Sequence, residues 1–93
     1  MNTILARELF DKAFILVGRN SGTFTSNDKK LYIFYDAWED YLVISLCRYD
    51  VEAKMTKKIK DVFIYKMGDI IKFEEEDTEW QNILKTELKK RGN

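Results

Sequence analysis

The sequence predicts an α+β domain: a four-stranded antiparallel sheet made of two hairpins and flanked by N- and C-terminal helices, in the order α-β-β-β-β-α. Two observations predict this class. Apolar residues recur at helical spacing at both ends of the chain, and between residues 31 and 75 they follow the two-residue period of strands. The chain has 93 residues, so we expect residues 1–93 to form a single domain.

The first predicted helix spans residues 3–17. Its apolar stripe has helical spacing and consists of Leu5, Leu9, Ala13 and Leu16. The stretch 13–17 is apolar at every position, so it fits a buried strand as well as a buried helix end. Gly18 follows at the position where a glycine commonly ends a helix.

Residues 31–37 and 41–49 form the first predicted hairpin, after a loop over residues 18–30 in which Phe24 can add a short edge strand. A turn over residues 37–40 pairs Tyr35 with Leu42, Ile33 with Ile44 and Leu31 with Leu46, whereas a tighter turn at Glu39 and Asp40 shifts the pairing by two residues and keeps the same facing. These six side chains share one face, because side chains alternate along a strand. The opposite face carries Tyr32, Phe34, Tyr41, Val43, Ser45, Cys47 and Tyr49.

The second predicted hairpin consists of residues 59–67 and 70–75, with residues 50–58 as a charged connection. Gly68 and Asp69 fit the centre of a type II′ turn. With that register, the aliphatic face continues with Val62, Ile64, Ile71 and Phe73. The other face continues with Phe63, Tyr65, Met67 and Ile70. The last predicted helix, residues 78–91, begins with Thr78 and Gln81 in the spacing of a capping box.

The face opposite the aliphatic one is unusually rich in aromatic residues for the exposed side of a sheet. Two amphipathic helices side by side would cover the aliphatic face and leave this second face open. An open apolar face usually marks a contact surface. The residues predicted to make the contact are Tyr32, Phe34, Tyr41, Tyr49, Phe63 and Tyr65. The alternative is that one helix covers each face.

Two further features are candidates for secondary contacts. Trp38 stands at the predicted tip of the first hairpin, where it either folds back on the core or is displayed as a contact residue. Five carboxylates fall within residues 74–79, which is more than the dipole of a helix N-terminus requires. The candidates for an acidic knob that meets a basic partner surface are Glu74, Glu75, Glu76 and Asp77.

The chain offers few residues for catalysis or metal binding. It contains no histidine, and its one cysteine, Cys47, is predicted in mid-strand as an inert packed thiol. We therefore predict a protein that is not an enzyme and has no catalytic residue, metal site or cofactor. A single cysteine cannot form an intramolecular disulfide, and no signal peptide or membrane-spanning stretch is recognisable. These features predict a cytoplasmic protein.

These properties together predict a small, non-enzymatic protein-interaction module that either associates with a copy of itself or binds a host protein through the aromatic face. The alternative function is binding of single-stranded nucleic acid by the same tyrosines with Lys57, Lys58 and Lys60. The sixteen basic and sixteen acidic residues balance, which disfavours nucleic acid, and no membrane partner is expected. The proline-free, lysine- and glutamate-rich composition is typical of accessory proteins of low-GC bacteria, their phages and mobile elements.

Overall fold

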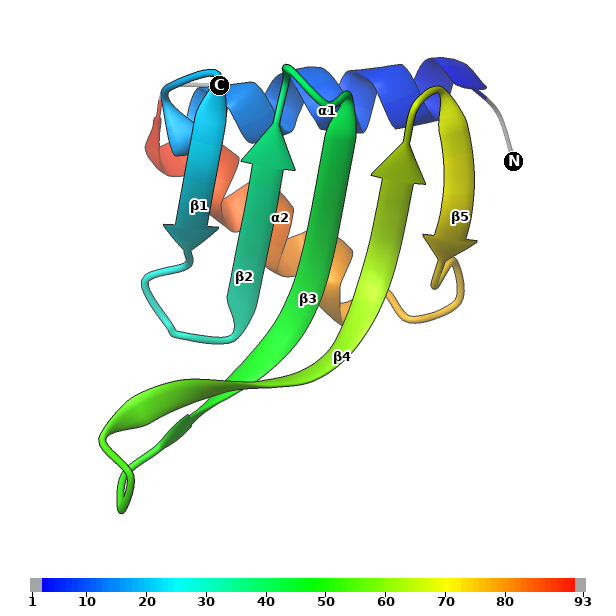
Figure 1. The fold of residues 1–93 in the computed structure, drawn as a ribbon. Helices are drawn as coiled ribbons and strands as arrows, with labels where there is room; N and C mark the ends of the chain where they lie inside the picture. Colours follow the sequence, from blue (N-terminus) through cyan, green and yellow to red (C-terminus); the bar gives the residue numbers. More distant parts are fainter. Residues whose placement is uncertain (1–2, 92–93) are drawn as a thin grey trace.

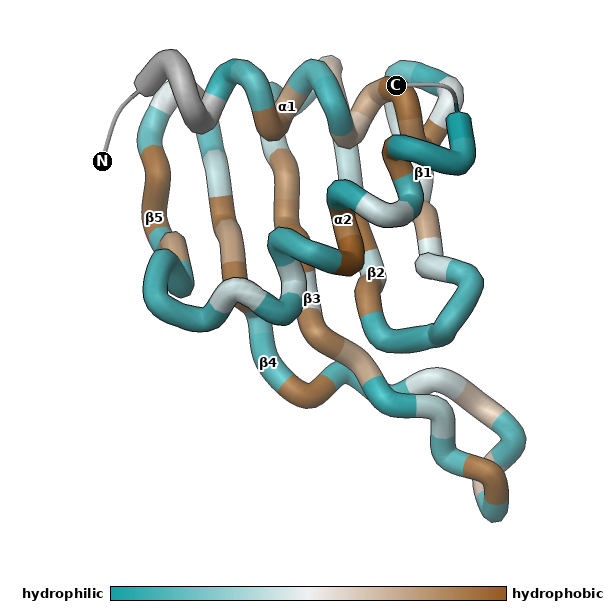
Figure 2. The backbone as a smooth tube through the Cα atoms, turned by 180° about the vertical axis from the view of Figure 1, so that it is seen from behind, coloured by the Kyte–Doolittle hydropathy of each residue, from teal (hydrophilic) through white to brown (hydrophobic). Residues whose placement is uncertain are grey.

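The computed structural model describes residues 3–91, with side chains from Arg7 onward. The chain runs through α1 (Thr3–Val17), β1 (Ser21–Thr25), β2 (Leu31–Asp36), β3 (Tyr41–Asp50), β4 (Met55–Lys66), β5 (Asp69–Phe73) and α2 (Glu79–Lys90). The strands form one antiparallel sheet in which neighbours in sequence are neighbours in space. Figure 1 shows both helices behind this sheet, and Figure 2 shows them in front of it when the molecule is seen from the other side. The α+β class is confirmed, and the alternative with one helix on each face is wrong.

The sheet has five strands, so the predicted number of four was wrong. The additional strand is β1, which pairs with β2 and places Thr23 opposite Phe34. Phe24 of β1 lies opposite Ile33 and packs against the core between sheet and helices. The polar residues of β1 have little preference for strands. The segment forms a strand because its backbone pairs with the N–H and C=O groups at the edge of β2.

Helix α1 continues to Val17, so residues 13–17 are helical. Phe14 and Ile15 within this run are exposed, and the consecutive apolar residues therefore do not mark a buried strand. Gly18 ends the helix with a φ of +76°, and its N–H donates to the Phe14 carbonyl at 2.8 Å. This is the left-handed conformation that favours glycine after a helix.

Of the two registers that the sequence allows for the first hairpin, the structure has the one with the turn over residues 37–40, and the shared facing predicted for both is confirmed. Leu31 pairs with Leu46, Ile33 with Ile44 and Tyr35 with Leu42. The turn begins at Asp36, whose Oδ1 accepts the backbone N–H groups of Trp38 and Glu39 at 3.0 and 3.3 Å. An aspartate that binds the backbone in this way favours a turn, and it fixes the hairpin at the position that the sequence predicts.

The turn between β4 and β5 differs from the prediction by one position. Met67 and Gly68 occupy its centre with φ values of +50° and +89°, which makes it a type I′ turn and pairs Lys66 with Asp69. The predicted centre at Gly68 and Asp69 is therefore wrong. Moving the centre of a two-residue turn by one position changes the strand pairing by two residues, so Tyr65 and Ile70 still share a face, as the sequence predicts.

The pairing of β4 with its two neighbours contains three register shifts. Ile59 and Val62 are extra residues of β4 beside β3, and Ile71 is an extra residue of β5 beside β4. Phe63 consequently lies opposite Ile44, and Tyr65 lies opposite Leu42, both on the helix side. The prediction that Phe63, Tyr65 and Ile70 face away from the helices is wrong, as is the prediction that Ile64 faces them.

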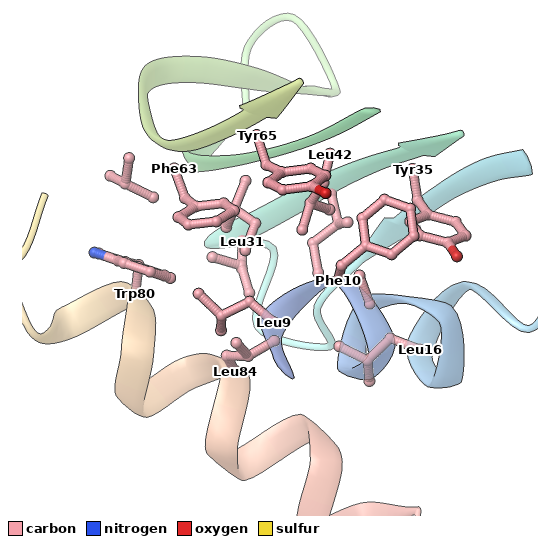
Figure 3. Close-up of a cluster of buried hydrophobic side chains, with 14 of the residues drawn as sticks. Leu9, Phe10, Leu16, Leu31, Tyr35, Leu42, Phe63, Tyr65, Trp80 and Leu84 are labelled. Atoms are coloured by element: carbon pink, nitrogen blue, oxygen red, sulfur yellow. The ribbon is translucent and has the colours of Figure 1, made fainter. Parts of the chain in front are cut away.

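The core lies between the sheet and the two helices (Figure 3). The Phe10 ring packs between Tyr35 and Tyr65, with ring centroids 4.8 and 5.4 Å away. At the other end of the core, Trp80 of α2 lies 6.2 Å from Phe63. Leu5, the first member of the predicted stripe of α1, has a side chain outside the described part of the structure.

Helix α2 does not begin with the predicted capping box. The side chain of Thr78 makes no capping hydrogen bond. Asp77 Oδ1 instead accepts the Glu79 N–H at 3.1 Å, and the Gln81 amide donates to the Glu75 carbonyl at 3.5 Å. The sequence predicts that Thr78 caps the helix, but the capping hydrogen bond is accepted by Asp77, in the acidic segment before the helix.

Candidate functional site

The candidate site is the face of the sheet that is turned away from the helices. In Figure 1 this face is turned toward the viewer, and no helix crosses it. We use the name open face for its central side chains, which are Tyr32, Phe34, Tyr41, Val43 and Ile64. Pairing of Phe34 with Val43, and of Val43 with Ile64, joins them across three strands. The face is therefore a continuous surface of apolar and aromatic side chains.

Aromatic side chains cover the middle of the open face. The rings of Phe34 and Tyr41 meet edge to face, with centroids 5.7 Å apart and an angle of 65° between their planes. Val43 beneath them is buried, whereas Phe34 itself remains 36% exposed. The rings thus shield the backbone of the sheet and present an aromatic surface to the outside.

Polar side chains surround this aromatic centre. On the β1 side the pairing places Thr23 next to Phe34. On the β4–β5 side, Lys66 pairs with Asp69, and Ile64 pairs with Lys72. An apolar centre with a polar rim is the usual composition of a protein–protein contact surface.

A polar cluster lies next to the open face, in the middle of β3 and β4, where Ser45 pairs with Asp61. Ser45 Oγ donates to Asp61 Oδ1 at 2.7 Å, and Lys58 Nζ lies 3.3 Å from the same carboxylate oxygen. The hydrogen bond from Ser45 lowers the pKa of Asp61 although burial opposes the shift. Burial raises the pKa of the nearby Cys47 thiol, which favours the protonated and unreactive form. The cluster holds the strands together and contains no activated nucleophile.

The structure separates the six predicted aromatic contact residues into three groups. Tyr32, Phe34 and Tyr41 lie on the open face. Phe63 and Tyr65 lie in the core, where Tyr65 donates its hydroxyl to Asp40 at 3.3 Å. Tyr49 is exposed, but it lies beyond the sheet, on the extension of β3.

Trp38 is displayed and not folded back on the core. Its side chain is 78% exposed at the tip of the β2–β3 turn. The neighbouring β4–β5 turn is attached there, since the Met67 N–H donates to the Asp40 carbonyl at 2.8 Å. Met67 is also exposed, so two large apolar side chains stand at the same end of the sheet.

The predicted acidic knob is the segment between β5 and α2. Two of its carboxylates are held by lysines: Glu74 lies 3.6 Å from Lys72, and Asp77 lies 3.2 Å from Lys60. Glu75 and Glu76 are exposed. The knob is therefore partly neutralised at its two ends and negative in its middle.

The sequence-based reasoning missed Ile64 on the open face and the length of the β3–β4 hairpin. Residues 50–58, predicted as a connection, belong to β3, β4 and the turn between them. Asp50 Oδ1 accepts the N–H groups of Glu52 and Ala53 at 3.0 and 3.1 Å, which repeats the arrangement at Asp36. In both turns an aspartate, Asp36 or Asp50, ends one strand and four residues separate it from the next strand. This repeated pattern could have identified the second turn from the sequence.

Comparisons with known proteins give no identification. The chain matches no protein-family model, no curated protein and no solved structure. Within residues 3–91, no group of three or more histidine, cysteine or acidic side chains is placed to hold a metal ion. Neither described helix is long and apolar enough to cross a bilayer.

Proposed function

We propose that this protein is a non-enzymatic interaction module that binds a protein partner through the open face. One observation carries the proposal: both helices lie on the same side of the sheet, so no element within residues 3–91 covers the other side. The face is aromatic at its centre, where interface contact energy is usually concentrated. A cytoplasmic accessory role in a bacterium, phage or mobile element agrees with the composition and with the free thiol of Cys47.

The dimensions of the face favour a small interface. Five strands about 4.8 Å apart, over the six-residue length of β2, give a surface of roughly 20 by 20 Å, or about 400 Å² in projection. Interfaces that bury less than about 1,200 Å² in total belong to the weaker and more transient class. A reversible complex is therefore the expected product.

The chemistry of the face also favours a reversible complex over an obligate one. Tyr32 and Tyr41 are half-buried and carry hydroxyls that need hydrogen-bond partners when a complex forms. Obligate interfaces are more hydrophobic than this. The complementary partner has an apolar centre with hydrogen-bond acceptors for the tyrosines, and an acidic group next to Lys66 at the rim.

Nucleic-acid binding receives less support from the arrangement of the lysines. Lys57 lies 2.9 Å from Asp50, and Lys58 lies 3.3 Å from Asp61. Lys60 lies 3.2 Å from Asp77. Each lysine of that alternative is thus engaged with a carboxylate, which reduces the charge available to phosphates.

A site-specific photo-crosslinking experiment in the native host tests the proposal. Phe34 on the open face and Phe14 on α1 are replaced, one at a time, by a photoreactive phenylalanine. The two positions form a matched pair, because their side chains are 36% and 43% exposed but lie on opposite sides of the domain. We expect a discrete protein adduct from position 34 and none from position 14, and we expect Tyr41→Glu to abolish the adduct.

Three results would contradict the proposal. Equal crosslinking from both positions would show non-specific contact, and an adduct with nucleic acid would support the alternative function. The absence of any adduct from position 34, with the folded protein present in the cell, would show that the face has no partner there.

A further inference from the structure

The β3–β4 hairpin continues beyond the body of the domain as a two-stranded ribbon, residues 48–60, which we name the arm. Its strands pair with each other, with Arg48 opposite Lys57 and Asp50 opposite Met55. In Figures 1 and 2 the arm leaves the sheet at the end where β2 begins and β5 ends, and it extends below the β1 side. It is the part of the described chain that projects farthest from the helices.

The arm displays large apolar side chains that contribute nothing to the described core. The exposed ones are Tyr49, Val51, Met55 and Ile59. Val51 at the turn is 77% exposed, and Ile59 is 61% exposed. An isolated two-stranded ribbon is only marginally stable in water, so the arm gains order and buries apolar surface when it docks on another surface.

The arm is also basic, whereas the rest of the chain is acidic. Residues 48–60 contain five basic and two acidic residues, and because the whole chain is neutral, the remainder has three more acids than bases. Three of the arm's lysines have carboxylate partners, as described above. Arg48 and Lys54 are exposed and, within the described residues, have no carboxylate at ion-pair distance.

The acidic counterpart lies at the same end of the molecule. The segment between β5 and α2 lies below the β4–β5 side of the sheet in Figures 1 and 2, and the arm extends below the β1 side. Glu75 and Glu76 in that segment are exposed and, in the part of the chain that the structure describes, form no ion pair. Ile71 of β5 is exposed close to it in sequence and offers apolar surface.

We infer that the arm is a dimerisation element that docks on the acidic segment of a second copy of this chain. A half-turn about an axis perpendicular to the sheet, at the end where both features lie, places each arm along the acidic segment of the other copy. Arg48 and Lys54 then face Glu75 and Glu76 of the second copy twice, as a two-fold interface requires. The exposed apolar residues of the arm are covered in the same contact.

This dimer leaves the open faces free. Because the axis is perpendicular to the sheet, both open faces point to the same side, and the dimer presents two identical surfaces to a partner. Two linked sites raise the apparent affinity of a weak contact without any additional contact residue. The inference uses only residues of the arm and the acidic segment, so the dimer can be tested independently of the proposal that the open face binds a partner.

Charge reversal on the two sides provides the test. One variant carries Arg48→Glu and Lys54→Glu, and the other carries Glu75→Lys and Glu76→Lys. All four side chains are exposed, so circular dichroism and the urea midpoint are expected to stay close to those of the unmodified protein. The mass is measured by light scattering for each protein alone and for the two variants mixed.

We expect the unmodified chain to have twice the monomer mass of 11.1 kDa and to dissociate as salt is added. Each variant alone is expected to be a monomer, because arm and segment then carry like charges. The mixture is expected to regain the dimer mass, because each arm again meets the opposite charge. Phe34→Glu, on the open face, is expected to leave the dimer mass unchanged.

Three outcomes would overturn the inference. The unmodified chain could remain a monomer up to about 1 mM, where even an interface with millimolar Kd is substantially occupied. The variants could remain dimers, or their mixture could stay monomeric. If the unmodified chain is a monomer that binds a nucleic-acid duplex in a salt-dependent way, and the Arg48→Glu, Lys54→Glu variant loses this binding, the arm would instead be assigned to a groove of the duplex.

Discussion

Phe63 and Ile64 are neighbours on β4 that face opposite sides of the sheet, so their truncation is expected to have very different costs. Phe63 is fully buried, with ring centroids 5.6 Å from Phe73 and 6.2 Å from Trp80. Removing a buried phenylalanine side chain costs about 3–5 kcal/mol, because it loses transfer free energy and leaves a cavity. Ile64 is half-buried on the open face, where water fills the vacated space, and we expect Ile64→Ala to cost about 1 kcal/mol.

The cost of a substitution has to be compared with the total free energy of unfolding of the protein. At roughly 0.05–0.15 kcal/mol per residue, a chain of 93 residues has a free energy of unfolding of about 5–14 kcal/mol. Phe63→Ala therefore removes a large part of the stability and can unfold the protein. Phe63→Leu, which retains most of the apolar volume, is expected to cost about 1–2 kcal/mol and keeps the comparison measurable.

Urea unfolding followed by circular dichroism gives the free energies, and thermal unfolding provides a check of about 4–8 °C per kcal/mol for a domain of this size. The expected order of stability loss is Phe63→Ala, then Phe63→Leu, with Ile64→Ala no larger than the second. The facing that the sequence predicts requires the reverse order for the two alanine variants. A loss at Ile64→Ala as large as that at Phe63→Ala would therefore refute the register in which Phe63 faces the helices.

Two further predictions concern the turns and the polar cluster. Met67→Asn is expected to raise the unfolding free energy by about 0.5–1 kcal/mol, because asparagine tolerates the positive φ that methionine adopts at this exposed turn position; a urea midpoint at or below that of the unmodified protein contradicts this. The pKa of Asp61 is lowered by the Ser45 hydrogen bond and that of Asp50 by the Lys57 hydrogen bond, so both carboxylates stabilise the fold above the unfolded pKa of about 4. Stability is therefore expected to fall as the pH drops below about 5, and Asp61→Asn is expected to make that fall shallower in urea unfolding at stepped pH; an unchanged pH profile in this variant rules the explanation out.

The aromatic part of the open face was predictable where local signals set the strands. Tyr32, Phe34 and Tyr41 lie where the two-residue alternation places them, because Asp36 fixes the β2–β3 turn and the turn fixes the register. The same reasoning failed one hairpin later. There the turn is set by Met67, a residue with no preference for positive φ, and nothing in the local sequence identifies it as a turn centre.

The elements whose signals are local follow from the amino-acid sequence alone. The helical period and Gly18 define α1, and alternation with an aspartate turn defines the β2–β3 pair. The side of β4 that faces the helices follows from the packed fold and not from the local sequence, because it depends on which side chains fill the space between the sheet and the helices. The rings of Phe63 and Tyr65 fill it against Phe10 and Trp80, and the extra residues in the ladders allow the strands to turn those rings inward. Both helices pack on that one side and leave the other side of the sheet open. The pairing of the strands does not determine on which side each helix packs, so the open side could not be predicted from it.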